Sequence, residues 1–140
     1  MVRSTSLLVC ASVTLALLGG CSADVDSTSG NALGEFGFEA NVMPLVTEAC
    51  NCHQSSPFLM APFSLKPGGA YMNLIGKTSA QVPTMQIVEP GALNASYLWH
   101  KVNGTHLEVG GIGVIMPPTV PLDAEERRVF ERWIASGAGP

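Results

Sequence analysis

The stretch Glu48-Ala49-Cys50-Asn51-Cys52-His53 decides how the rest of the chain is interpreted. It ends a segment with helical periodicity, and it sets two cysteines and a histidine close together. Cys50 and Cys52 are two positions apart, which is about 200° around a helix of 3.6 residues per turn. On regular helical backbone the two thiols therefore face different directions and cannot both meet one edge of a flat partner.

A cysteine followed directly by histidine at the end of a helix is the core of the C-x-x-C-H haem attachment motif. In that motif both thiols add to haem vinyl groups and the histidine binds the iron. Ala49 stands where the first cysteine of the motif would be. We therefore expect Cys52 to form a thioether. Cys50 either stays unattached or reaches the haem through local unwinding. Taken alone, the motif is equally compatible with a paired or metal-binding thiol cluster.

Met116 supplies the second half of the expected site. It precedes Pro117-Pro118 in a Gly-rich stretch before the last helix. A residue before proline is pushed toward extended backbone, and the proline pair stiffens the loop. Haem iron in c-type cytochromes takes a second axial ligand, and methionine sulfur raises the reduction potential. His100 and His106 are the weaker alternative ligands, and for His100 a position at the surface or facing a haem propionate is the stronger expectation.

The sequence predicts four short helices and no strands. They cover 38–50, 69–75, 94–102 with Asn94 as its N-cap, and a final helix between Asp123 and Gly137. This gives a thin core for about a hundred residues, and long Pro/Gly-rich stretches separate the helices. A large buried apolar cofactor would explain such loops. The expected fold class is all-α, with helices and loops packed around one haem.

The N-terminus has the layout of a secretory signal over residues 1–20. Arg3 precedes an apolar run that is shorter than the roughly 20 residues of a membrane span. The run ends in Leu18-Gly19-Gly20-Cys21, which resembles the bacterial lipobox, and this resemblance implies a lipid on Cys21. Ordinary signal cleavage is the alternative. Residues 21–34 then form the acylated cysteine and a flexible tether, and residues 35–140 form the domain.

Composition excludes several classes of function. The net charge is −4, and the few Lys and Arg residues form no basic stripe, so nucleic acid is not an expected partner. No Ser/His/Asp set, phosphate-binding Gly loop or pair of catalytic carboxylates is apparent. We therefore expect an electron carrier or binding domain and not an enzyme.

Taken in order, the motifs resemble the small c-type cytochrome domains of bacterial secreted proteins, including the planctomycete-type group. The resemblance runs through Val42–His53, Leu65–Leu74, Val88–Gly104, Met116–Pro118 and Trp133–Ala138. It covers nearly the whole mature domain. It implies a cytochrome c-like fold, one covalent haem c, His53 and Met116 as axial ligands of the iron, and Cys52 as a thioether. The chain departs from the pattern at the first cysteine of the motif.

The expected function is outer-sphere electron transfer with an unidentified redox partner, from a domain anchored by lipid to the cell envelope. Ser22 follows the acylated cysteine where aspartate would favour the inner membrane, so the outer membrane is expected. Two alternatives remain open at this point. One is a haem-free structural or binding module. The other is a Cu(I) site built from Cys50, Cys52, His53 and Met116. Gas sensing would require Met116 to leave the iron.

Overall fold

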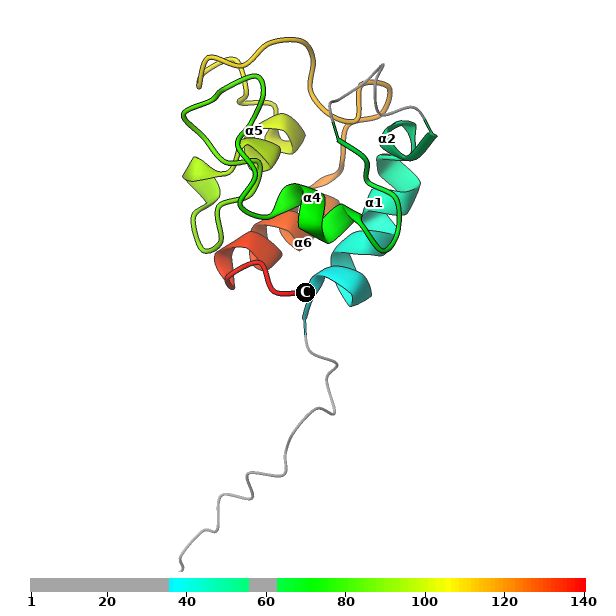
Figure 1. The fold of residues 1–140 in the computed structure, drawn as a ribbon. Coiled ribbons are helices and arrows are strands. Elements are labelled where there is room, and N and C mark those ends of the chain that lie inside the picture. The colour runs from blue at the N-terminus through cyan, green and yellow to red at the C-terminus, as the bar shows by residue number, and fades with distance from the viewer. Residues whose placement is uncertain (1–35, 56–62) are drawn as a thin grey trace, which may run out of the picture. The chain divides into compact units, whose positions relative to one another are not determined.

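Two aromatic residues from opposite ends of the domain meet at the centre of its core. A computed structural model describes residues 36–55 and 63–140. The ring centroids of Phe38 and Trp133 lie 5.2 Å apart, and both side chains are fully buried. The carbonyl of Gly139 accepts hydrogen bonds from the Phe38 amide at 3.2 Å and from Trp133 Nε1 at 2.8 Å. The C-terminus therefore lies beside the first helical turn (Figure 1).

The expected helix 38–50 is divided by its proline. A π-helical turn, η1 (Phe38–Val42), leads into α1 (Met43–Ala49), and Pro44 occupies the first turn of α1. Proline is tolerated there because the amides of a helix's first turn have no intrahelical acceptor. The chain then breaks at Cys50 and resumes as α2 (Cys52–Ser55), a short helix that the periodicity did not predict.

The second half of the domain carries α4 (Ala70–Leu74), the 3₁₀ turn η2 (Leu93–Ala95), α5 (Tyr97–Asn103) and α6 (Ala124–Ala135). The expected N-cap at Asn94 is wrong. Asn94 lies in η2, and Ser96 precedes α5 with its hydroxyl bonded to the backbone of residues 89 and 92. The final helix follows the prediction, because Asp123 and Glu126 form a reciprocal capping box.

Across residues 36–55 and 63–140, β pairing is limited to isolated bridges, such as the one between Ile75 and Val88. At this level the all-α prediction is confirmed. No helix in this part of the chain is long and apolar enough to cross a membrane. The described residues belong to a compact unit, Asn31–Pro140. The signal at 1–20, the lipidation site Cys21 and the whole tether up to residue 34 lie outside the described residues.

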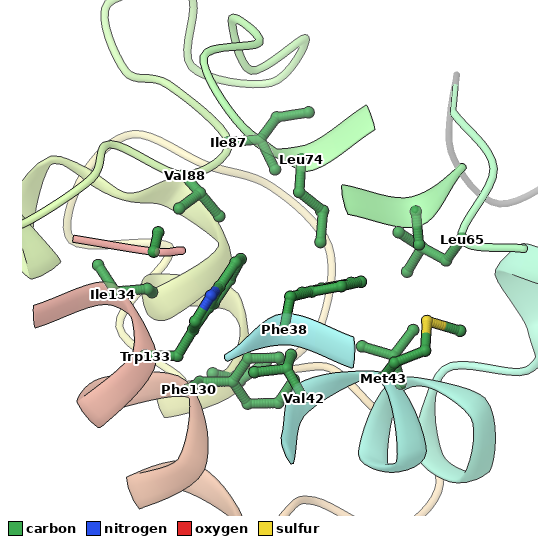
Figure 2. Packing of buried hydrophobic residues seen from close by; sticks show 14 of the residues in the cluster. Phe38, Val42, Met43, Leu65, Leu74, Ile87, Val88, Phe130, Trp133 and Ile134 are labelled. Atoms are coloured by element: carbon green, nitrogen blue, oxygen red, sulfur yellow. The ribbon is translucent and has the colours of Figure 1, made fainter. Parts of the chain in front are cut away.

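The core gathers around α6 and η1 (Figure 2). Phe130, Trp133 and Ile134 of α6 face Phe38 and Val42 from the N-terminal segment. Apolar residues from the connecting segments complete the cluster; the buried ones are Met43, Val46, Leu65, Ala70, Leu74, Ile87, Val88, Val102, Leu122 and Ala138. The core is thus formed by residues from nearly every element, and it holds the two ends of the domain together.

We predict that Trp133→Ala destabilises the domain by about 3–5 kcal/mol, because it leaves a cavity at the centre of the core. The loss of a donor to the Gly139 carbonyl adds to this cost. Val120→Ala, at a side chain that is 74% exposed, serves as the control and should change the unfolding free energy little. Chemical denaturation of both variants measures the difference. Equal midpoints would show that the contact between the two ends is dispensable.

Candidate functional site

A cavity of about 330 Å³ opens beside the core, and its wall is predominantly apolar. This volume lies within the range of small-molecule and cofactor sites. The lining residues come from the end of α1 through α2, from the segment before α4, from α4 and the segment after it, from α5 and from the loop before α6. They are Cys50, His53, Phe63, Leu65, Asn73, Lys77, Thr78, Ser79, Ala80, Gln81, Ile87, Tyr97, Leu98, Lys101, Val102 and Met116.

His53 is placed in the cavity wall by the turn that joins α1 to α2. Its amide donates to the carbonyl of Cys50 at 3.0 Å, and its own carbonyl accepts from the Leu65 amide at 3.2 Å. The imidazole stacks on the ring of Phe63, with centroids 5.7 Å apart and planes 7° from parallel. Burial lowers the pKa of His53, which favours the neutral imidazole that binds metals.

The Nδ1 atom of His53 is buried and has no hydrogen-bond partner among the residues that the structure describes. A buried polar atom left unpaired costs about 1–3 kcal/mol, so such atoms are usually explained by a water, an ion or a ligand. A half-buried imidazole with unused bonding capacity, set in an apolar cavity, is what an iron porphyrin requires of its protein ligand. The residues present therefore fit a haem.

Met116 reaches the same cavity from far along the chain. It is half-buried, and its amide donates to the carbonyl of Lys101 at 2.9 Å. The loop that carries Met116 is thereby joined to α5. The sequence predicted that His53 and Met116 belong to one site, and in the structure both residues line the same cavity.

Lys101 holds this loop in a second way. Its Nζ donates to the carbonyls of Ile112 at 3.1 Å and Val114 at 2.7 Å, although the residue is only 8% exposed. Burial lowers the pKa of Lys101, and no carboxylate among the described residues forms an ion pair with it. The ammonium group is therefore compensated by backbone carbonyls, which binds the loop to α5.

The two cysteines are not equivalent. Cys50 is half-buried, lines the cavity and packs against the core. Burial, together with the charge of Cys52, raises the pKa of the Cys50 thiol to about 11. Cys52 is exposed and does not line the cavity; it borders a shallow hollow with Asn51, Gln54, Lys66 and Pro67. This placement differs from the sequence-based expectation, which favoured Cys52 as the haem-facing thiol.

Neither alternative histidine lines the cavity. His100 is buried, with Nδ1 bonded to the Thr105 hydroxyl at 2.8 Å and Nε2 donating to the Asn94 carbonyl at 3.2 Å. The expected surface position of His100 is wrong, because both ring nitrogens are used inside the fold. His106 is buried in the loop, where Nε2 donates to the Gly113 carbonyl at 3.0 Å. Both residues shape the turn after α5.

Sequence reasoning missed the segment 77–81 as a wall of the cavity. Lys77, Thr78 and Gln81 give this wall its polar groups, and the Tyr97 hydroxyl donates to the amide oxygen of Gln81. A lysine and hydroxyl residues between α4 and α5 carry no motif, so only their position in the fold reveals them. Within the described ranges, no group of three or more His, Cys, Asp or Glu side chains is arranged to hold a metal ion.

Comparison of the chain with protein-family models, curated proteins and solved structures found no match.

We predict that Lys101→Met loosens the loop that carries Met116. Methionine keeps an aliphatic stem of similar length but removes the ammonium donor. The loss of two charge-assisted hydrogen bonds should lower the unfolding free energy by about 1–3 kcal/mol and speed amide exchange over residues 110–116. Hydrogen-exchange mass spectrometry measures this effect.

Lys77→Met is the matched control, because Lys77 borders the same cavity but is exposed. It should leave exchange in the loop unchanged. If Lys101→Met behaves like Lys77→Met, the loop does not depend on the buried ammonium.

Proposed function

We propose that this chain is a single-haem c-type cytochrome domain that carries electrons, tethered to the bacterial cell envelope by a lipid on Cys21. One observation carries the proposal. His53 and Met116, which lie far apart in sequence, line the same apolar cavity, and Cys50 lies in its wall. An imidazole and a thioether are the axial pair of cytochromes c, and a cysteine beside them supplies the means of covalent attachment.

In this proposal the chain binds, orients and shields the cofactor. When bound, the haem supplies a one-electron redox centre. His53 and Met116 would be the residues that hold the iron. Leu65, Ile87 and Val102 exclude water from the cavity, which keeps the surroundings of the iron apolar.

The polar wall suits the cofactor's carboxylates. Lys77 offers a cation, and Thr78 and Ser79 offer hydroxyl groups, at the side of the cavity that Gln81 also lines. Haem has an apolar ring and two propionate groups at one edge. A cation and hydroxyl donors in an otherwise apolar lining suit such a molecule. The ordered motifs that resemble small c-type cytochromes support a cytochrome c-like fold for the helices and loops described above.

The proposed reaction needs no catalytic side chain. Outer-sphere electron transfer requires a bound redox centre, a docked partner protein and little movement of the ligands. The buried charge of Lys101 and the hydrogen bond from Met116 restrain the ligand loop. A Cu(I) site of two thiols, His53 and Met116 is less well supported, because Cys52 lies outside the cavity wall.

We predict that the full chain, expressed with a cytochrome maturation system, is red and carries one haem. Met116→Ala should keep the haem, remove the weak far-red band of methionine–ferric iron coordination and lower the reduction potential. The change in potential is a fraction of the ~0.8 V over which axial ligands tune haem proteins. His53→Ala should lose low-spin haem. Optical spectra and a redox titration measure these effects.

Met72→Ala is the control, since Met72 is 66% exposed and does not line the cavity. Its spectrum and potential should match those of the unaltered chain. A colourless product, made in cells that load a co-expressed cytochrome, contradicts the proposal and leaves a haem-free binding module as the alternative.

A further inference from the structure

Only one of the two cysteines of the Cys-x-Cys-His segment lines the cavity. Cys50 and His53 both line the cavity, whereas Cys52 is exposed beside Lys66 and Pro67. Since a covalent bond to a group in the cavity requires a thiol that reaches it, the two positions are not interchangeable.

The backbone explains this difference. Cys50 ends α1 with φ −113° and ψ 22°, which departs from helical geometry, and α2 begins only at Cys52. The carbonyl of Cys50 accepts the hydrogen bond of the His53 amide at 3.0 Å, so one tight turn joins these two residues. Both residues that this turn joins line the cavity, whereas Cys52, directly before His53, does not.

The surroundings of Cys50 would also shield a thioether at this position from solvent. Its side chain packs against the apolar core and forms part of the cavity wall, near the residues that would exclude water from a bound porphyrin. A thioether at this position would be enclosed by the fold, whereas Cys52 is exposed and lies outside the lining of the cavity.

We propose that Cys50, three residues before the histidine, is the single covalent attachment point of the haem, and that Cys52 is not attached. This inference rests on the proposed function. In the step, the Cys50 thiol adds across one vinyl group of the iron porphyrin. A bond forms between Sγ and the vinyl carbon next to the ring, the carbon–carbon π bond breaks, and the thiol hydrogen goes to the terminal carbon. Thiol and alkene are consumed one to one, with no external oxidant or reductant, and the second vinyl group remains.

The test uses the full chain with a cytochrome maturation system and the matched variants Cys50→Ala and Cys52→Ala. Each product is denatured, extracted with acidified organic solvent and weighed by mass spectrometry. We expect the unaltered chain and Cys52→Ala to keep one haem after extraction. Cys50→Ala should lose its haem to the solvent completely. Peptide mapping of the unaltered chain should place the haem mass on Cys50, and its reduced pyridine spectrum should be that of a haem with one remaining vinyl group.

The mapping of the unaltered chain decides the question even if a variant fails to fold. Haem mass on Cys52, or two thioethers, overturns the inference while leaving the haem function intact. If the unaltered chain binds haem that the solvent extracts completely, the inference is likewise overturned and the haem function stays intact. A chain that holds no haem in any form overturns the proposed function, and this inference with it.

Discussion

The contact between the two ends of the domain is the constraint on which the rest of the structure depends. The Gly139 carbonyl accepts one bond from the Phe38 amide and another from the Trp133 ring. Through them, η1 is fixed against α6, and α1 leaves the core in one defined direction. The end of α1 therefore reaches the cavity wall at Cys50, and α2 places His53 next to it. Without this closure, short helices joined by long loops would have little to orient them.

The hydrophobic core and the cavity share several residues. Leu65, Ile87 and Val102 belong to the buried cluster and also line the cavity, so the cavity wall is the outer layer of the core. Apolar residues in such a wall gain free energy when a further apolar surface covers them, at roughly 25 cal/mol per Å² of area removed from water. A flat apolar cofactor with one polar edge would complete this layer. The proposed cofactor would thereby account for loops that are long for a domain of this size.

Local signals in the sequence predicted the final helix well, because its start depends on neighbouring residues alone. The capping pair of Asp123 and Glu126 and the apolar face of α6 appear as expected. The joint position of His53 and Met116 is not a local effect; the order of the motifs indicated it, and both residues line the same cavity. The start of α5 could not be predicted from local sequence. Asn94 is a common capping residue, but the residue before α5 is Ser96. Its hydroxyl is bonded to backbone groups of residues 89 and 92, which only the folded chain brings together.

The orientation of the two cysteines shows the limit of sequence reasoning most clearly. Helical periodicity correctly separates Cys50 from Cys52 by direction, but it assumes continuous helix and cannot say which thiol faces the cavity. The break at Cys50 arises where α1 ends and the chain turns to pack His53 against Phe63. That break is a tertiary effect. The second cavity wall, at residues 77–81, is likewise a product of the fold and not of a motif.

In the proposed function, the loop that carries Met116 has to be ordered before it can supply a ligand, and α5 provides this order. Closing a loop costs chain entropy, and a single bond from a methionine sulfur would otherwise have to offset that cost alone. Lys101 offsets part of this entropic cost through two groups. Its carbonyl accepts a hydrogen bond from the Met116 amide, and its ammonium group donates to the carbonyls of Ile112 and Val114. The buried His106 adds a bond to Gly113 within the same loop. Met116 is therefore positioned by the protein's own hydrogen bonds, and its side chain meets the cavity as a consequence of how α5 is folded.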